Sequence, residues 1–205
     1  MTISKRIFDL AGVLVLLPFL FPIITLIATL LLIVQGRPVF YGSERMRSPS
    51  QPFTLWKFRT MRPAADDHGV SGGDKTARIT PIGRFLRRSR LDELPQIVNI
   101  LAGDMSFVGP RPPLRYYVEA FPGVYTAVLQ SRPGVTGLAS LVYHRCEERL
   151  LAKCESAEET NRVYSQRCIP TKARLDLIYQ RNQTLCYDIK ILSNTVKNVA
   201  KSRPD

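Results

Sequence analysis

The sequence predicts a mostly helical α+β fold, in which an N-terminal membrane segment is followed by a compact domain on the cytosolic side of the membrane. Three observations favour this fold. Residues 7–34 are almost entirely apolar, residues 39–56 contain two strand-like stretches around a polar turn, and most of the remaining chain has helical periodicity. We therefore assign residues 1–36 to the membrane segment and residues 37–205 to the cytosol-facing domain.

The composition limits the partners that the protein is expected to have. The chain has 205 residues, and its 29 Lys and Arg exceed its 17 Asp and Glu, which gives a formal net charge of +12. This excess favours nucleic acid, anionic membranes or phosphorylated substrates as partners. The four cysteines form no CxxC pair, so we expect reduced thiols. With two histidines in the chain, any bound metal is expected to be a hard ion with oxygen ligands.

The apolar run of residues 7–34 is too long for a signal peptide, and no small-residue cleavage site follows it. A straight helix of this length would extend roughly 40 Å, more than the roughly 30 Å of a bilayer's hydrocarbon core. Pro18 and Pro22 predict a kink near its middle. Basic residues usually stay on the cytoplasmic side, yet they flank this run at both ends: Lys5, Arg6, Arg37, Arg45 and Arg47. We therefore favour a re-entrant membrane helix hairpin, with a simple span as the open alternative.

The segment after the membrane run predicts a β-hairpin, with strands at residues 39–41 and 53–56 around a Ser-Pro-Ser-Gln-Pro turn. Lys57 and Arg59 alternate with Phe58, so we expect both cations on one face of the second strand. A solvated strand face explains this alternation equally well.

Two basic or polar segments follow. Residues 63–75 are polar and glycine-rich and predict a loop, which either closes over a substrate or, as we favour, forms variable surface. Residues 81–90 predict a basic amphipathic helix in which Ile82, Phe85 and Leu86 share one face. Such a helix can lie on an anionic membrane with its arginines near the head groups.

The stretch Leu91–Pro113 brings acidic and basic groups together in the sequence. Asp92 and Glu93 lie in the first turn of a short amphipathic helix that is expected to end near residues 102–103, and a loop with Arg111 follows. Carboxylates, a helix N-terminus and an arginine-bearing loop suit a site that handles phosphate. The alternative is that the Asp-Glu pair only matches the positive end of the helix dipole.

The C-terminal half predicts further helices and shows no internal repeat. Residues 114–130 have helical periodicity, and residues 146–166 are charge-rich and predict a surface helix. Residues 171–181 and 189–199 predict amphipathic helices. These helices outnumber the short strands, which gives the α+β class its helical character.

Four sequence blocks carry a resemblance to a known family. They are Lys5–Asp9 (KRIFD), Lys57–Met61 (KFRTM), the central signature within Leu91–Pro112 (LDELPQ and GDMSFVGPRP) and Arg132–Leu138 (RPGVTGL). With these blocks in order along almost the whole chain, the sequence resembles the small monotopic phosphoglycosyl transferases, a group of bacterial sugar transferases. Pro22 lies where that family has its membrane break.

The resemblance implies transfer of a phosphosugar from a UDP-sugar to a polyprenyl phosphate such as undecaprenyl phosphate, with release of UMP, as the first membrane step of glycan assembly. Asp92 is then the expected nucleophile, which forms an aspartyl-phosphosugar intermediate with ping-pong kinetics. Mg²⁺ is the expected cofactor, and Asp92 is its first candidate ligand. Glu93 is expected to tune Asp92, to position it or to assist with the metal, and the sequence does not separate these roles.

The resemblance also implies which cations contact the substrate and where the protein acts. The expected phosphate-binding residues are Arg87, Arg111 and Arg132, with Lys57 and Arg59 as weaker candidates. The expected location is the bacterial inner (cytoplasmic) membrane, with the catalytic domain facing the cytoplasm and anionic lipids around it. A homodimer is an open alternative to a monomer.

Residues 139–168 depart from the family pattern. This departure leaves the identity of the transferred sugar open, but it does not change the expected reaction class. Two other classes of protein account for part of the sequence. A basic membrane-surface scaffold explains the charge and the apolar run, but not the adjacent carboxylates or the arginine-bearing loop. A nucleic-acid-binding protein explains the charge only, because the chain lacks aromatic residues interleaved with basic ones. We therefore expect no nucleic-acid partner.

Overall fold

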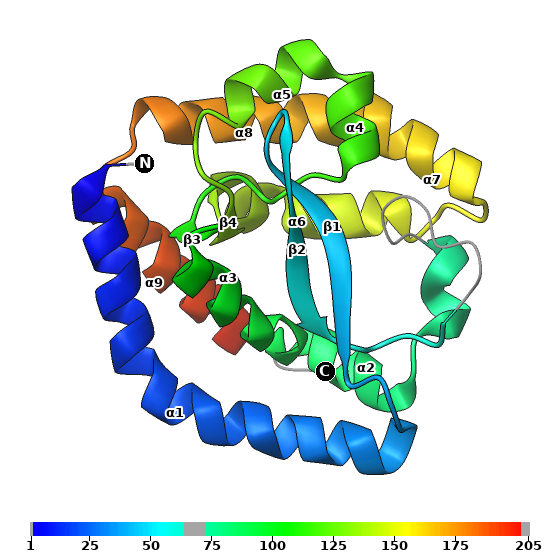
Figure 1. Cartoon of the computed structure of the whole chain (residues 1–205). Helices are drawn as coiled ribbons and strands as arrows, with labels where there is room; N and C mark the ends of the chain where they lie inside the picture. Colours follow the sequence, from blue (N-terminus) through cyan, green and yellow to red (C-terminus); the bar gives the residue numbers. More distant parts are fainter. Residues whose placement is uncertain (1, 64–72, 202–205) are drawn as a thin grey trace.

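Helix α1 (Ile3–Gln35) is the longest element of the computed structural model, which describes residues 2–63 and 73–201 (Figure 1). Pro18 and Pro22 lie inside α1, and the helix changes direction near its middle (Figure 1). Each proline removes a backbone donor and clashes with the preceding turn, so the bend has a local cause. Among the described residues, α1 is the single helix long and apolar enough to cross a membrane.

The N-terminal end of α1 is fixed to the rest of the protein by buried polar contacts. Lys5 forms an ion pair with Asp188, and the two side chains are 3% and 1% exposed. Asp9 accepts hydrogen bonds from Ser106 Oγ at 3.0 Å and from the backbone N–H of Phe107 at 3.2 Å. The first turns of α1 are therefore part of the folded domain's polar interior.

The C-terminal end of α1 is also bound to the domain. Arg59 donates hydrogen bonds to the carbonyl oxygens of Gln35 at 2.6 Å and Gly36 at 2.9 Å, where a positive charge complements the helix dipole. Between its two ends, one side of α1 packs into two apolar clusters. The first cluster contains Val13, Leu55, Ile97, Ile100 and Met105, and the second contains Ile27, Leu31, Phe58 and Leu86.

Strands β1 (Phe40–Ser48) and β2 (Gln51–Phe58) form the predicted antiparallel hairpin, which is longer than the sequence indicated. The prediction that Lys57 and Arg59 share one strand face is wrong. Because β2 ends at Phe58, the alternation stops there: Lys57 reaches Glu93, whereas Arg59 turns back to the end of α1.

Helix α2 (Pro81–Arg88) confirms the basic helix predicted for residues 81–90. Thr80 caps it by accepting a hydrogen bond from the backbone N–H of Gly83 at 3.0 Å. Of the predicted loop at residues 63–75, residues 64–72 lie outside the described residues, and Gly73–Arg78 forms the short helix η1.

The predicted helix after residue 91 consists of two parts. A 3₁₀ turn, η2 (Leu91–Gln96), contains Pro95 and leads into α3 (Ile97–Ala102), which ends at Gly103 with a φ of 83°. The predicted end of the helix is confirmed, while its first turn is tighter than an α-helix. Strands β3 (Ser106–Val108) and β4 (Gly134–Thr136) then pair in parallel and bring the block around Arg132 beside the end of α3.

Two predictions for the C-terminal half need correction. Residues 114–130 form two helices, α4 (Arg115–Ala120) and α5 (Pro122–Val128), because Pro122 disfavours helical geometry at Phe121. The charge-rich segment 146–166 is not one surface helix. It is divided among α6 (Leu138–Leu151), α7 (Ala157–Val163) and the wide π-helical turn η3 (Tyr164–Cys168), and it contributes Leu151 and Tyr164 to the core.

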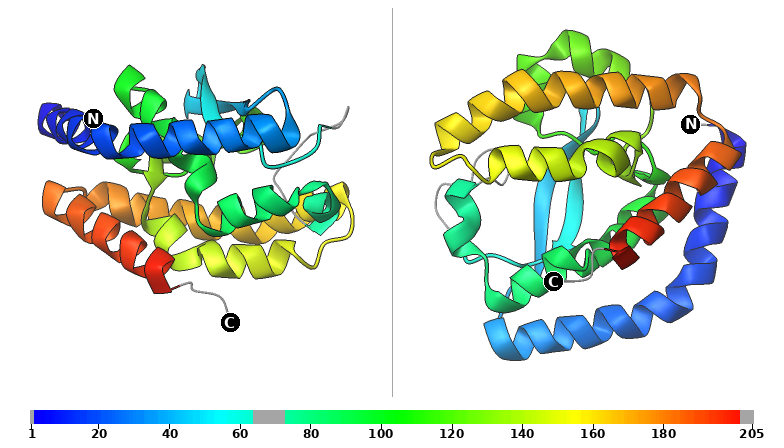
Figure 2. Two further views of the ribbon diagram at one scale, coloured as in Figure 1. Left: turned by 90° about the horizontal axis from the view of Figure 1, so that it is seen from below. Right: turned by 180° about the vertical axis from the view of Figure 1, so that it is seen from behind.

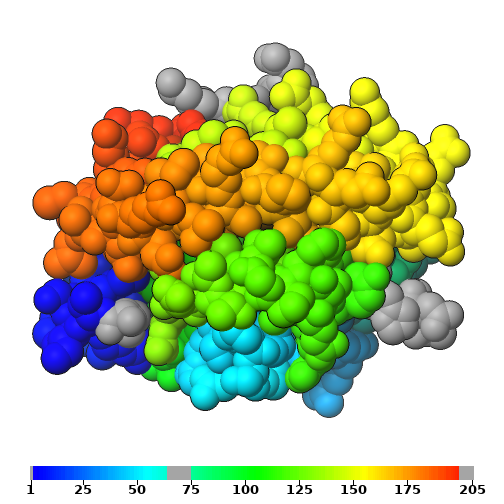
Figure 3. All heavy atoms as spheres, turned by 90° about the horizontal axis from the view of Figure 1, so that it is seen from above, coloured from blue at the N-terminus to red at the C-terminus, as the bar shows by residue number. Residues whose placement is uncertain are grey.

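Helices α8 (Ile169–Arg181) and α9 (Leu185–Lys201) confirm the last two predicted helices. Seen from below, α1 and the hairpin lie on one side of the molecule, and α6, α8 and α9 lie on the other (Figure 2, left). The space-filling view shows the hairpin turn at the surface beside α4 and α5, with the first turns of α1 on the same face (Figure 3). The short helices η2 and α3 lie between the two sides.

Several apolar side chains are left uncovered by the domain. Phe85 is 62% exposed although it was expected to share a face with Leu86, which is only 2% exposed. Val98 on α3 and Val196 on α9 are also exposed, at 53% and 67%. These helices therefore carry apolar surface that faces away from the domain core.

Candidate active site

A sharp change of backbone direction places Asp92 and Glu93 beside the hairpin. Helix α2 ends at Arg88, and Arg90 takes a left-handed conformation with a φ of 60° before η2 begins. A non-glycine residue in this region is uncommon and carries strain. The turn directs the first residues of η2 toward β2, and Asp92 and Glu93 are only 6% and 9% exposed.

Glu93 is fully neutralised by basic side chains. Its Oε1 accepts hydrogen bonds from Lys57 Nζ at 2.8 Å and from Arg111 Nη2 at 2.7 Å. Arg90 Nη1 lies 3.7 Å from its Oε2. Burial alone would raise the pKa of Glu93, but the charges of Arg111, Lys57 and Arg90 hold that pKa well below its usual value. Glu93 is therefore a permanently charged anchor for these cations.

Asp92 is the residue next to Glu93, but its carboxylate lacks such direct partners. Within residues 2–63 and 73–201, the Asp92 carboxylate accepts no hydrogen bond, and no basic nitrogen lies within ion-pair distance of it. Burial raises the pKa of Asp92 and the negative charge of Glu93 adds to the increase, while Lys57, Arg87 and Arg111 oppose it. A buried carboxylate with unused lone pairs is available to react with, or to bind, an incoming group.

Three of the predicted phosphate-binding cations lie around this pair. Lys57 and Arg111 bind Glu93 directly and also act electrostatically on Asp92. Arg87 acts on Asp92 from α2, where its Nε donates a hydrogen bond to Thr60 Oγ1 at 2.9 Å. The structure therefore brings together five of the seven site residues that the sequence indicated: Asp92, Glu93, Lys57, Arg87 and Arg111.

The other two predicted residues lie elsewhere. Arg59 binds the C-terminal carbonyl groups of α1. Arg132 is close to Gly103, and the charges that act on it most strongly are those of Arg47 and Arg6 rather than those at Asp92. Neither residue is among the strongest electrostatic influences on Asp92 or Glu93.

Two arginines near the site, Arg90 and Arg45, were not among the named site residues, although some arginines of the segment 81–90 were expected to face Asp92. Arg90 pairs with Glu93, and the sequence signal that could have identified it is its place in the run of arginines that ends one residue before Leu91. Arg45 lies close to Arg111, and its buried Nε has no hydrogen-bond partner. Burial lowers the pKa of Arg45 to about 10, and the positive charge of Arg111 contributes to this decrease. The site thus holds more positive charge than the sequence motifs indicated.

The chemistry of the carboxylates decides which metal fits. Among the described residues, no three His, Cys, Asp or Glu side chains lie together as a metal-binding group. Mg²⁺ needs only one or two protein carboxylates, because substrate phosphates and water complete its coordination. Asp92 fits this role, since it is buried and without a direct cationic partner, whereas Glu93 is already bound by Lys57 and Arg111.

Another buried carboxylate, Asp176, lies on α8, where the charges of Lys172 and Glu147 act on it. Asp176 is 6% exposed, and its Oδ1 has no hydrogen-bond partner. Burial raises the pKa of Asp176 to about 7, although the charge of Lys172 opposes this shift. Lys172 in turn donates a hydrogen bond at 2.8 Å to Glu147, whose charge also acts on Arg111.

Replacing Asp176 with Asn is expected to stabilise the protein at alkaline pH. The folded-state pKa of about 7 lies above an unfolded-state value of about 3.9, so folding binds a proton between these values. Wild-type stability therefore falls as the pH rises from about 4 to about 7. The Asp176→Asn variant does not lose this stability, because its amide does not titrate. At pH 8 it is expected to be more stable than the wild type by roughly 2–4 kcal/mol.

The measurement is denaturant unfolding in detergent at pH 4 and pH 8, with Glu158→Gln as the control for loss of an exposed carboxylate. Wild type and Asp176→Asn are expected to differ at pH 8 and to converge at pH 4. An equal difference at both pH values would show that Asp176 does not change protonation on folding.

Comparisons with known proteins identify a family and several similar sequences. A protein-family model described as "Bacterial sugar transferase" matches residues 1–202. The chain is 34% identical over 200 residues to the "Uncharacterized sugar transferase EpsL" of Bacillus subtilis (strain 168), covering 98% of this chain and 89% of that protein.

Two similar proteins have named substrates and are longer. The "UDP-glucose:undecaprenyl-phosphate glucose-1-phosphate transferase" of Klebsiella pneumoniae is 33% identical over 198 residues, which cover 95% of this chain and 39% of that protein. The "UDP-N-acetylgalactosamine-undecaprenyl-phosphate N-acetylgalactosaminephosphotransferase" of Aeromonas hydrophila is 29% identical over 201 residues, which cover 95% of this chain and 43% of that protein. The chain thus spans about two fifths of the length of these two relatives.

Proposed function

The chain belongs to the bacterial sugar transferase family, and from this premise we propose that it transfers a phosphosugar from a UDP-sugar to undecaprenyl phosphate. The products are undecaprenyl diphosphate sugar and UMP. The observation that carries the proposal is the pair at the start of η2, where Asp92 is buried without a partner beside a fully neutralised Glu93. The names of the relatives from Klebsiella and Aeromonas support the substrate classes.

The proposed reaction has two steps at one phosphorus atom. A carboxylate oxygen of Asp92 attacks the sugar-bearing phosphorus, the bond from this phosphorus to the bridging oxygen breaks, and UMP leaves with that oxygen. An oxygen of undecaprenyl phosphate then attacks the same phosphorus, and the bond to Asp92 breaks. Covalent catalysis of this kind divides one difficult displacement into two easier ones.

The surrounding cations address the main electrostatic problem, because an anionic nucleophile must approach an anionic phosphate. Glu93 holds Lys57 and Arg111 in place, and both cations also act on Asp92. Arg87 contributes from α2. We assign Glu93 the role of positioning these cations, which favours one of the three roles that the sequence left open.

Mg²⁺ fits this site and would be held by Asp92 together with oxygens of the substrate. When bound, the ion would supply positive charge at the phosphates of the UDP-sugar. Glu93, whose carboxylate is occupied by Lys57 and Arg111, is the weaker candidate ligand.

We propose that α1 is re-entrant rather than membrane-spanning. Its two ends are bound to one folded domain, Lys5 at the start and Gln35 at the end, which favours entry and exit on one membrane face. The bend near Pro18 and Pro22 supports the same topology. Exposed Phe85, Val98 and Val196 would then lie against the membrane surface, near anionic lipids.

This topology predicts that cysteines placed at Ile3 and Arg37 react from the same side. In a variant without the four native cysteines, Ile3→Cys and Arg37→Cys are both expected to be labelled by an impermeant maleimide in inverted vesicles and protected in intact spheroplasts. Ile3 is the first residue of α1, Arg37 lies two residues after its end, and both are exposed. Labelling of the two positions from opposite sides would identify a simple span and reject the re-entrant topology.

We propose a bacterial inner-membrane protein whose catalytic domain faces the cytoplasm, the location that the family resemblance implies. A homodimer stays a prediction from sequence. Membership of the family does not identify the transferred sugar, because the relatives from Klebsiella and Aeromonas are named for different sugars.

The function is tested by assaying detergent-solubilised protein with undecaprenyl phosphate, Mg²⁺ and a panel of UDP-sugars, and by distinguishing UMP from UDP. Release of UMP with one sugar supports phosphosugar transfer and identifies the substrate, and EDTA is expected to abolish it. Release of UDP would indicate ordinary glycosyl transfer and would contradict the proposed mechanism.

A further inference from the structure

A second group of cations lies at the turn of the β-hairpin, away from Asp92. Lys57, which contacts Glu93, and Gln51, which contacts Arg47, lie at opposite ends of β2. At about 3.3 Å per residue these ends are roughly 20 Å apart. A group bound at the turn would therefore not reach the phosphorus that Asp92 attacks.

Three guanidinium groups from separate segments meet at this turn. Arg6 Nη2 and Arg132 Nη1 lie 3.5 Å and 3.4 Å from the point that a side chain at Gly103 would occupy. Burial lowers the pKa of Arg132, and the positive charges of Arg47 and Arg6 lower it further. These three arginines, which we call the arginine triad, are thus close enough to repel one another.

The negative charge inside the arginine triad does not balance it. Asp104 lies 3.6 Å from Arg47 Nη1, and the charges of two carboxylates, Asp104 and the buried Asp9, act on Arg132. Arg6 uses two of its donors on the carbonyl oxygens of Ile100, at 2.6 Å, and Leu101, at 2.8 Å. These carbonyls satisfy donors but carry no full charge, so three guanidinium groups against two carboxylates leave the triad an excess of about one positive charge.

Arg132 is the member without a protein partner. Across residues 2–63 and 73–201, its guanidinium donates no hydrogen bond and forms no ion pair. An arginine has five donors, and a half-buried one that faces two like charges is unfavourable unless an anion joins it. A bound anion therefore explains the position of Arg132 better than the contacts of the folded chain do.

Two members of the arginine triad, Arg47 and Arg132, line a cavity of about 150 Å³ that is open to the surface. Its other lining residues are Ser48, Gln51, Leu129 and Gln130, and all of the lining residues except Leu129 carry a side-chain N–H or O–H group that can donate to an anion. The hairpin turn lies at the surface in the space-filling view (Figure 3). A small anion can therefore enter without a change in the fold.

We propose that Arg6, Arg47 and Arg132 bind a phosphate group at this turn, at a site separate from Asp92. Guanidinium forks match the geometry of phosphate oxygens, and three of them suit a monoester or diester better than a carboxylate. Exposed Ile3 and Ile7 lie next to Arg6 on α1, at 82% and 62% exposure. An apolar rim beside a phosphate site favours the head group of an anionic lipid over a free phosphate ion.

The test is isothermal titration of full-length protein in a neutral detergent, with short-chain phosphatidic acid as the probe and inorganic phosphate as the second arm. Arg132→Gln is expected to weaken binding of phosphatidic acid by about tenfold or more, because it removes a charge-assisted contact. Arg47→Gln is expected to act in the same direction, and Arg132→Lys is expected to restore part of the affinity.

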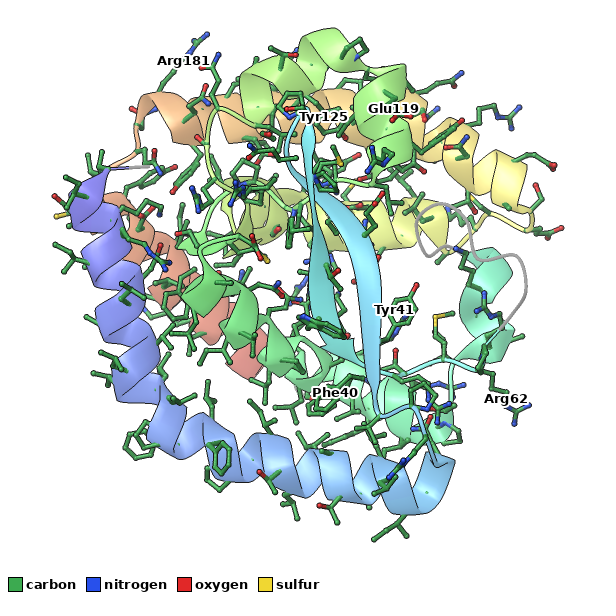
Figure 4. All side chains as sticks on the ribbon, viewed as in Figure 1. Phe40, Tyr41, Arg62, Glu119, Tyr125 and Arg181 are labelled. Atoms are coloured by element: carbon green, nitrogen blue, oxygen red, sulfur yellow. The ribbon has the colours of Figure 1, made fainter. Side chains whose placement is uncertain are left out.

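Arg181→Gln is the matched control, because Arg181 is exposed and projects outward from α8 (Figure 4). It is expected to leave the affinity unchanged. Binding by phosphatidic acid alone identifies a lipid site, and equal binding by inorganic phosphate identifies a site for soluble phosphate. The proposal is overturned if Arg132→Gln and Arg47→Gln weaken binding no more than Arg181→Gln.

Phosphate binding at the arginine triad does not depend on the proposed reaction. Asp92→Asn is expected to bind phosphatidic acid with wild-type affinity at the arginine triad, since the two sites are at opposite ends of β2. Loss of binding in Asp92→Asn would place the phosphate at the catalytic pair and would also reject a separate site.

Discussion

Replacing Asp92 with Asn is expected to abolish phosphosugar transfer, with a decrease in turnover of at least about a thousandfold. The amide that replaces the carboxylate keeps its size but cannot form an acyl phosphate. Asp92 is 6% exposed and has no ion-pair partner among the described residues, so the substitution removes an unfavourable buried charge. The Asp92→Asn variant is therefore expected to fold at least as stably as the wild type.

The measurement is UMP release, together with the unfolding free energy of the same samples. Glu119→Gln is the matched control, because Glu119 is an exposed carboxylate on α4 (Figure 4), and its loss is expected to leave turnover unchanged. A labelled sugar phosphate should remain attached to wild-type protein and be absent from Asp92→Asn. Substantial turnover by a folded Asp92→Asn variant would rule out Asp92 as the nucleophile.

Replacing Lys5 with Met is expected to destabilise the protein by about 3–5 kcal/mol. Lys5 and Asp188 form an ion pair in which both side chains are at least 97% buried. Tyr179 also donates a hydrogen bond to Asp188 at 2.6 Å, but a neutral hydroxyl cannot replace the lost positive charge. Asp188 would then remain as a buried and uncompensated carboxylate.

Denaturant unfolding measures this effect, with Lys190→Met as the control for loss of an exposed lysine on the same helix, α9. The double variant Lys5→Met/Asp188→Asn is expected to be less destabilised than the sum of its single substitutions, because the partners are removed together. Additive losses would show that the two groups do not interact in the folded state.

The parts of the fold that depend on local sequence were predictable. The hairpin followed from two alternating stretches around a proline-containing turn, and the end of α3 followed from Gly103. The acidic pair could be identified as the centre of the site because its position at the start of a helix is also a local property. Pro122, which divides α4 from α5, was a local signal that the helical periodicity of residues 114–130 obscured.

The different roles of Asp92 and Glu93 were not predictable, because they depend on contacts between residues that are distant in the sequence. Lys57 and Glu93 are 36 positions apart, and only the folded chain shows that Glu93 binds Lys57 and Arg111 while Asp92 does not. The position of Arg132 was not predictable for the same reason. Its motif matches a family block, yet the pairing of β3 with β4 carries it to Gly103 and away from Asp92.

The anchoring of α1 at both ends has a consequence for how this protein is made. Because α1 supplies Val13, Ile27 and Leu31 to clusters that also contain Leu55 and Phe58, the domain's interior is completed by α1, the helix that we propose to be re-entrant in the membrane. Insertion into the bilayer and folding of the domain are then expected to be one cooperative event during synthesis. A chain released from the ribosome without a membrane would expose both apolar clusters at once, so aggregation competes directly with insertion.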